Sequence, residues 1–218
     1  AVWDEHGIAL HMAGAATDAT ARKEAESEAK RLNERLNVSV NELQQQADEL
    51  SRLREMADLI QSCTTLEEAY RIIGNFAQRL FSASSGAAFM INQSRNLVEA
   101  TTVWGNMTAE EQVFQPEDCW ALRRTKPNLV DTLHSTLKCS HVKGEPPGGY
   151  LCLPLTAQGE TFGTLHLRDA GNKGAQRLSN RSNLIELFAE QVALTLGNLK
   201  LRETLRSQSI RDPLTGLF

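Results

Sequence analysis

The chain has 218 residues with 23 basic and 27 acidic side chains, which gives a formal net charge of −4. This length accommodates one complete domain with flanking helices, because domains of about 100 to 150 residues are the commonest. The slight acidity provides no positive surface for a phosphate backbone or an anionic membrane, so we expect neither nucleic acid nor membrane among the partners.

The cysteines and the apolar runs indicate the compartment. Four cysteines in 218 residues are too sparse for a secreted disulfide scaffold and suit the reducing cytoplasm. No apolar run approaches the roughly 20 residues that cross a bilayer, so we expect no membrane helix within this segment. The chain starts without Met and ends on the apolar pair Leu217-Phe218, and we interpret it as an excerpt of a longer protein.

The first sixty residues predict two strands and a long helix. Residues 2–16 alternate as two short strands around a turn at residues 4–7, and Asp18 is placed to cap a helix. That helix, residues 19–60, carries apolar side chains at spacings of three and four, close to the coiled-coil average of about 3.5. These side chains are Leu32, Leu36, Val40, Leu43, Ala47, Leu50, Leu53, Ala57 and Ile60. The pattern favours a dimeric coiled coil over the alternative, a long solvated helix lying on its own domain.

The middle of the chain predicts a helix, a hairpin and a short helix. Threonines at 64–65 followed by glutamates at 67–68 form a capping box ahead of a helix that ends near Leu80. Residues 86–92 and 97–105 are strand-like and separated by polar residues, which predicts a hairpin. Residues 108–111 form a second capping box. Pro116 then starts a short helix, which Lys126-Pro127 ends before a short strand at residues 128–131.

The last third of the chain predicts a second hairpin and a closing helix. Residues 132–149 are irregular, residues 150–157 and 161–169 form the hairpin, and a helix runs from about Ser179 to Ile210. One sheet with helices at both ends of the chain predicts an α+β fold in which the terminal helices lie together on one sheet face. The other face is left for the short helices and the irregular segment, and we expect the pocket there.

Three stretches resemble the GAF domain, a ligand-sensing and dimerising module of bacteria. They are "FQPEDCWALRRTKP" at 114–127, "YLCLPLTAQGETFGTLHL" at 150–167 and "LIELFAEQVALTLGNLKL" at 184–201. The resemblance implies a GAF-like antiparallel sheet with helices on both faces, preceded by the long coiled-coil helix and followed by a signalling helix. The first stretch resembles a subgroup common in front of diguanylate cyclases.

The two ends of the chain resemble other signalling domains. "RDPLTGLF" is similar to the start of a GGDEF domain, and "DEHGIALHMAGAATDATARKEAE" is similar to the last strands and exit of a PAS domain. The implied organisation is a PAS tail at 1–18, a coiled-coil linker at 19–60, a GAF domain at 61–200, an exit helix at 201–211 and the first residues of GGDEF at 212–218. Such a protein is a cytoplasmic sensor that controls synthesis of cyclic di-GMP. Its catalytic residues would lie beyond Phe218, so we expect this segment itself not to be an enzyme.

The cysteines and histidines of the middle segment are the candidate site. Cys119 lies where a helix begins, and free N–H groups there stabilise a thiolate. Cys139 and His141 lie two residues apart and, with Cys119, offer three zinc-type ligands, to which His134 or Cys152 could add a fourth. The ligand-pocket candidates are Cys119, Trp120, Arg123, His134, Cys139 and His141. The alternatives are that these residues are ordinary core and surface groups or that they line a pocket for an organic ligand. The sequence leaves the cofactor open, with zinc or none as the candidates and no histidine selected for haem.

Other residues near the site are open to two interpretations. Cys152 and His166 alternate with leucines on their strands, so both point to the face opposite those leucines, with core packing favoured for Cys152. Phe114, Trp120 and Trp104, together with Leu122, line an apolar cavity or are plain core. Cys63 has no companion and is expected to be inert.

The resemblance excludes two ligands and leaves three functions open. The Asn-Lys-Phe-Asp-Glu pattern of cyclic-nucleotide-binding GAF domains is absent, as is the adjacent Cys-His pair of bilin-binding relatives, so both ligands are disfavoured. The leading interpretation is a homodimeric sensor that passes a small-molecule, metal or redox signal through its flanking helices, with Leu36, Leu43, Leu50, Leu196 and Leu199 in the dimer contact. One alternative is a free methionine sulfoxide reductase in which Cys119 attacks and Cys139 resolves. The other is a ligand-free dimerisation spacer.

Overall fold

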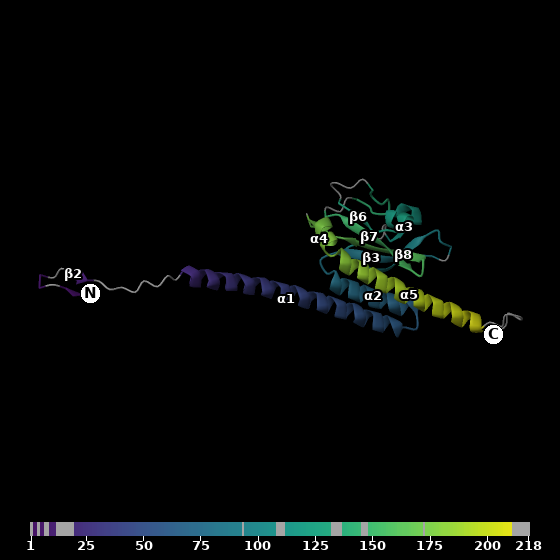
Figure 1. Cartoon of the computed structure of the whole chain (residues 1–218). Helices are drawn as coiled ribbons and strands as arrows, with labels where there is room; N and C mark the ends of the chain where they lie inside the picture. The colour runs from purple at the N-terminus through teal and green to yellow at the C-terminus, as the bar shows by residue number, and fades with distance from the viewer. Residues whose placement is uncertain are drawn as a thin grey trace. The chain divides into compact units, whose positions relative to one another are not determined.

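The computed structural model describes residues 2–3, 5–6, 9–11, 20–92, 94–107, 112–131, 137–144, 148–171 and 173–210, and the chain divides into two compact units, 1–47 and 48–218. In the first unit β1 (Val2–Trp3) pairs antiparallel with β2 (Ala9–His11), as the alternation predicted. Helix α1 (Thr20–Gln61) begins in the first unit and ends in the second, close to the predicted bounds (Figure 1). The expected Asp18 cap, the 108–111 capping box, His134 and the GGDEF-like segment lie outside the described residues.

A six-stranded antiparallel sheet forms the centre of the second unit. Its strand order is β5-β4-β3-β8-β7-β6, and each neighbouring pair is antiparallel. Both predicted hairpins are confirmed: Gly86 of β3 faces Trp104 of β4, and Cys152 of β7 faces His166 of β8. The strands are β3 (Ser85–Ile91), β4 (Val98–Trp104), β5 (Val113–Phe114), β6 (Asn128–Val130), β7 (Tyr150–Ala157) and β8 (Glu160–Arg168).

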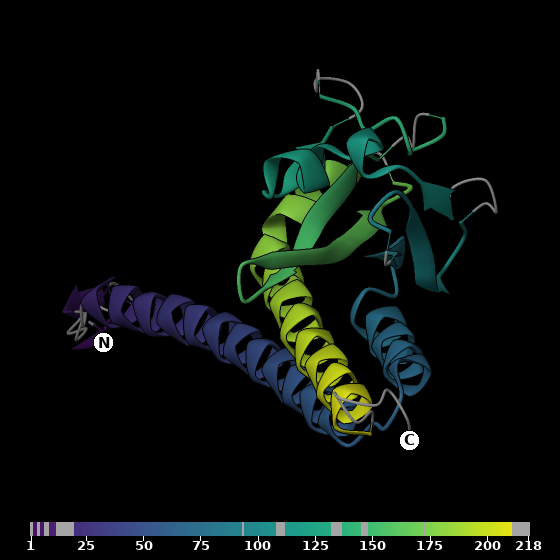
Figure 2. The same ribbon diagram turned by 90° about the vertical axis from the view of Figure 1, so that its right-hand side faces the viewer.

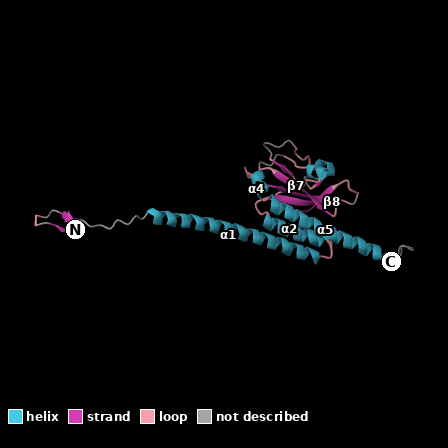
Figure 3. Cartoon of the chain, in the orientation of Figure 1, coloured by secondary structure: helices cyan, strands magenta, loops and turns pink. Residues whose placement is uncertain are grey.

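Helices cover both faces of this sheet, which confirms the predicted α+β class (Figure 3). Helix α2 (Leu66–Leu80) begins at the predicted capping box, where the Thr65 hydroxyl accepts the Glu68 N–H at 3.3 Å and the Glu68 carboxylate accepts the Thr64 N–H at 3.0 Å. The sequence predicted a single helix from about 179 to 210, and the predicted start is wrong. Helix α4 (Gly174–Asn180) ends where the Arg181 N–H bonds to the carbonyls of its last turn, and α5 (Ser182–Ile210) begins beyond it.

The sheet separates two cores. On one face the end of α1, α2 and α5 pack over leucines of β7 and β8, and Figure 2 shows these helices on the same side of the sheet. The buried leucines of the strands are Leu151, Leu153, Leu155, Leu165 and Leu167. On the other face lie 3-10 helix η2 (Pro116–Asp118) and α3 (Trp120–Arg124), with Phe89, Cys119 and Cys152 in the second core. The prediction that Cys152 points away from the leucines is confirmed.

The predicted coiled-coil seam of α1 has two environments. Leu53 and Ile60 are buried in the chain's own core, whereas Leu36 and Leu43 are exposed by 65% and 64%. The interpretation as a helix on its own domain is therefore right for the last turns, and the earlier turns leave an apolar stripe uncovered.

Two leucines assigned to the dimer contact are placed elsewhere. Leu196 and Leu199 are buried against the sheet and α2, so they stabilise this chain itself. The sequence pattern of α5 contains two apolar faces, and the exposed one holds Leu187, Leu194, Leu201 and Leu205. The assignment to Leu196 and Leu199 was therefore wrong, because it selected the inward face.

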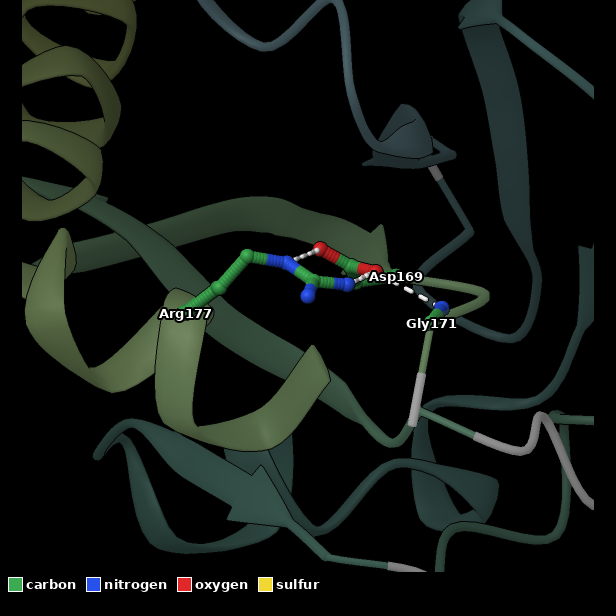
Figure 4. Close-up of polar contacts among 3 residues, drawn as sticks. All are labelled: Asp169, Gly171 and Arg177. Carbon is green, nitrogen blue, oxygen red and sulfur yellow. Dashed lines mark hydrogen bonds and ion pairs between the residues drawn. The ribbon is translucent and has the colours of Figure 1, made fainter. Parts of the chain in front are cut away.

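An ion pair fixes the end of the central hairpin (Figure 4). Asp169, directly after β8, is buried, and its carboxylate accepts hydrogen bonds from Arg177 of α4 and from the Gly171 N–H. A Cβ on Gly148 would lie 1.9 Å from the Asp169 carbonyl oxygen, so the backbone entering β7 packs directly on this turn. The hydrogen bonds from Arg177 hold the pKa of Asp169 below its ordinary value of 3.8.

We predict that Asp169→Asn lowers the free energy of unfolding by about 1 to 2 kcal/mol at neutral pH, because charge-assisted hydrogen bonds are lost at a partly screened pair. A lowered folded-state pKa stabilises above the unfolded value, so the difference from wild type should shrink as the pH falls below about 4. Urea unfolding at several pH values measures it.

The matched control is Glu160→Gln, which removes the carboxylate of an exposed pair with Arg95. It should cost about 0.5 kcal/mol or less. Equal losses for the two variants would contradict a specific anchoring role for Asp169.

Candidate functional site: a buried cluster of three cysteines and a histidine

Four buried residues on the sheet face opposite the long helices bring their reactive atoms together. They are Cys119, Cys139, His141 and Cys152, and one sulfur or ring nitrogen from each lies within 4.8 Å of all the others. Their side chains are at most 4% exposed. The three residues chosen from sequence as zinc-type ligands are thus adjacent, and of the two suggested fourth ligands Cys152 joins them.

The local backbone explains why the loop residues point inward together. Cys139 and His141 are buried and the intervening Ser140 is exposed, within a turn in which the Val142 N–H donates to the Cys139 carbonyl oxygen at 3.3 Å. The Ser140 N–H donates to the carbonyl oxygen of Asp118 at 2.9 Å, which ties this loop to the segment that carries Cys119. The Cys139 N–H donates to the Tyr150 hydroxyl oxygen at 2.6 Å and ties it to β7.

Polar groups around the cluster donate hydrogen bonds to the sulfur of Cys139. The backbone N–H of Trp120 donates to its Sγ at 3.4 Å, and the side-chain amide of Asn128 does so at 3.5 Å. Hydrogen bonds from Cys119 and then Cys152 lower the pKa of Cys139 strongly, with a further contribution from His141. Among the three thiols of the cluster, these contacts favour the thiolate form of Cys139 most.

Cys119 behaves opposite to the expectation from its place at a helix start. The N–H of the first residue of α3 is directed at Cys139, and Cys119 forms no side-chain cap. Its hydrogen bond to Cys139 raises the pKa of Cys119 to about 11, so its thiol is protonated at neutral pH when it has no other partner. The expected activation of Cys119 is opposed by its hydrogen bond to Cys139, and the Trp120 N–H is directed at Cys139.

Cys152 and His166 form the floor of the cluster. Cys152 Sγ lies 3.6 Å from His141 Nε2 and 3.3 Å from Nδ1 of His166, its partner on the neighbouring strand. Burial raises the pKa of Cys152 and lowers that of His166. Both groups are therefore neutral near pH 7 unless a cation compensates them.

Aromatic rings separate the cluster from solvent. Phe114 stacks on the His141 ring with centroids 4.1 Å apart and planes at 15°, and Phe89 packs edge-on against Phe114 at 4.9 Å. Trp120 and Leu122 are half-buried at the border of the same core. Of the four apolar residues considered as pocket lining, Trp104 belongs to the core on the opposite face.

Arg123 does not enter the site. Its side chain is exposed, and the guanidinium lies over the Trp120 ring, 4.1 Å from the centroid, as a surface cation–π pair. The sequence indicated a pocket on this face; among the described residues, Phe114 and Phe89 pack next to the cluster.

A cleft of about 470 Å³ opens on the helix side of the sheet instead. Its lining includes Tyr70 of α2, Glu99 of β4, and Lys200 of α5. None of the candidate site residues contributes to this cleft, so the cluster and the cleft are separate features.

The arrangement supports soft-metal binding or thiol oxidation. Three sulfurs and one imidazole nitrogen are compatible with zinc, which prefers such donors. From the sequence, core packing was favoured for Cys152 over metal binding, and no role was predicted for His166, Tyr150 or Asn128. Strand alternation was the available signal for Cys152 and His166, but no local pattern indicated that Asn128 and Tyr150 would meet Cys139.

A family model described as GAF domain matches residues 63–196, which is more than half of the chain. The chain therefore belongs to the GAF domain family, whose members generally act as regulatory and sensory modules. None of the curated protein sequences matches it significantly. Among the described helices, none is long and apolar enough to span a bilayer.

Solved structures share the fold at low identity. The free methionine-R-sulfoxide reductase from Neisseria meningitidis, in complex with its substrate, is 9% identical with a TM-score of 0.58 over 71% of this chain and 91% of that one. The GAF domain of an Acinetobacter phosphoenolpyruvate-protein phosphotransferase is 11% identical, with a TM-score of 0.55 over 72% and 97%. The nlh2 GAF domain of A. aeolicus in an inactive state is 14% identical, with a TM-score of 0.55 over 72% and 98%. These identities support the fold alone.

Cys63 was expected to be inert from sequence, but it is half-buried, whereas the other three cysteines are buried. We therefore predict that Cys63 reacts with an aromatic disulfide reagent at least about tenfold faster than they do. Timed absorbance of the released thiolate measures the phases, with unfolded protein giving the total. Cys63→Ser should remove the fast phase. Fast reaction of all four thiols in the native chain would contradict the buried cluster.

Proposed function

We propose that this chain is the sensory and dimerising region of a cytoplasmic protein that controls a downstream diguanylate cyclase domain. The observation that carries the proposal is the pairing of a buried thiol–imidazole cluster with two long helices that leave apolar stripes exposed. The cluster is the input site, for a metal ion, a small molecule or a redox change. The assignment of the parent protein rests on the GGDEF-like segment at residues 212–218 and on the PAS-like residues 1–18.

The strand that carries Cys152 provides a route from input to output. Cys152 lies between Leu151 and Leu153, which belong to the core that packs against α5 on the opposite face. A change in how the cluster is filled shifts β7, and the packed leucines transmit the shift to α5. Because α5 runs to Ile210, its movement reaches the segment that resembles the start of GGDEF.

The exposed stripes favour a second copy of the chain as partner. On α1, Leu32, Leu36, Val40, Leu43 and Leu50 are each about half exposed or more. Seven-residue steps relate Leu187, Leu194 and Leu201 on the outer face of α5. Heptad-spaced apolar residues bury themselves by pairing helices. A ligand that changes how two such helices meet biases two states of the dimer.

We predict a parallel dimer for the chain in light scattering at tens of micromolar, and at least about a tenfold weaker dimer for Leu43→Lys, since a charge enters the apolar seam. Leu43 is exposed within one chain, so we expect the substitution to leave folding unaffected. The control is Asn41→Lys, an exposed position off the stripe that should leave dimerisation unchanged. A monomeric wild-type chain would refute the scheme.

A second candidate is a thiol-dependent enzyme that reduces free methionine sulfoxide, favoured by three adjacent buried cysteines and by the fold shared with the Neisseria reductase. In this case Cys139, with its lowered pKa, would be the better nucleophile and Cys119 the resolving thiol, the reverse of the roles inferred from sequence. The burial of the four side chains, each at most 4% exposed, restricts access of a substrate and favours sensing.

The enzyme assay separates the two functions. Under the sensing proposal, wild type reduces free methionine sulfoxide with a dithiol no faster than Cys139→Ser does. Activity lost in Cys139→Ser and kept in Cys63→Ser would establish the enzyme instead. Product methionine, quantified by mass spectrometry, is the readout.

A further inference from the structure

We propose that Cys119, Cys139, His141 and Cys152 together bind one zinc ion in tetrahedral coordination, as three thiolates and one imidazole. The inference names the ligand of the proposed input site and rests on that proposed function only for its regulatory role. Metal binding itself stands on the geometry of the four side chains.

The distances suit a single ion. Zinc–sulfur bonds of about 2.3 Å and zinc–nitrogen bonds of about 2.0 to 2.1 Å place tetrahedral ligands roughly 3.5 to 3.8 Å from one another. Cys152 Sγ and His141 Nε2 lie 3.6 Å apart, and every pair among the four atoms is within 4.8 Å. Four atoms this close to one another can be ligands of one ion, and side-chain rotations would bring the longer pairs to ligand spacing.

The polar groups around the cluster are those that support metal-bound thiolates. The backbone N–H of Trp120 and the side-chain amide of Asn128 donate hydrogen bonds to Cys139 Sγ. The Nδ1 of His166 lies 3.3 Å from Cys152 Sγ and is placed to donate its hydrogen to that sulfur. Metal ligands are commonly oriented by such outer hydrogen bonds. In a purely apolar core these donors would have only weak thiol acceptors.

A bound cation would also compensate the negative charge of three neighbouring thiolates. Three sulfurs and one imidazole nitrogen share one buried space, all within 4.8 Å of one another. A dication would neutralise two of three thiolates, and the N–H donors would disperse the remaining charge.

The donor set selects the class of metal and its role. Thiolate and imidazole favour zinc and comparable soft ions and exclude magnesium and calcium, which take oxygen ligands. Four protein ligands leave no open position, as in zinc sites that hold structure. The ion would join the segment before α3, the 137–144 loop and the centre of β7. Its binding or loss therefore changes how this layer is held to the sheet, on the strand that contacts α5.

The test is the metal content of the whole chain purified with a reductant. We expect about one equivalent of zinc per chain in wild type and in Cys63→Ser, and at least a tenfold loss in Cys152→Ser. We expect His166→Ala to keep the metal with affinity weakened about 10- to 100-fold in a chelator competition, since it acts through Cys152.

Cobalt(II) added to the metal-stripped wild-type chain covers the case in which a cysteine variant fails to fold. Tetrahedral thiolate coordination gives sulfur-to-cobalt charge-transfer absorption and intense ligand-field bands, and zinc should displace both. Absence of zinc together with absence of the cobalt bands would overturn the proposal, as would equal zinc in wild type and Cys152→Ser.

The oligomeric state keeps this inference separable from the proposed function. A chain that is dimeric but binds neither metal retains the sensory role and loses the zinc site. A chain that binds zinc and is monomeric retains the zinc site and loses the signalling scheme.

Discussion

The two-residue alternation of β7 and β8 is the constraint on which the rest of the structure depends. Leucines at every second position face the helices, and Tyr150, Cys152 and His166 between them face the opposite layer. A shift of either strand by one residue would place sulfur and imidazole among the helices and leucines against the loops. The burial of five leucines, worth roughly 1.5 to 3 kcal/mol each, therefore fixes the register that aims Cys152 at its partners.

The same alternation connects the two faces mechanically. Because Cys152 and its leucine neighbours share one short backbone segment, the cluster cannot move without disturbing the contact between β7 and α5. The Asp169–Arg177 pair holds the end of this hairpin and limits the movement to the sheet itself. Under the proposed function, the input site lies on one face of β7 and the output helix packs on the other.

Sequence patterns predicted the framework well where the signal is local. Both hairpins, the capping box at Thr65 and the long α1 follow from periodicity and cap residues that act within a few positions. The patterns failed where two periodic faces compete. The leucines of α5 form an inner and an outer stripe, and choosing between them for Leu196 requires knowing which stripe the sheet covers.

The residues of the candidate site could be predicted from the sequence, but the pKa order of their thiols could not. Cys119, Cys139 and His141 were selected as soft ligands, but the pKa order of the thiols depends on contacts across long sequence separations. The hydrogen bond between Cys119 and Cys139, 20 residues apart, lowers the pKa of Cys139 and raises that of Cys119, opposite to the order expected from the helix start. The sequence likewise suggested a pocket on this face, where Phe114 stacks on His141 and Phe89 packs against Phe114.

X-ray absorption at the zinc edge of the purified chain tests the central claim most directly, because it reads the atoms bound to the metal. The account predicts three sulfur neighbours at about 2.3 Å and one nitrogen neighbour at about 2.0 to 2.1 Å. A shell of oxygen and nitrogen alone, or a chain without zinc in which the cluster cysteines are joined by a disulfide, would contradict it.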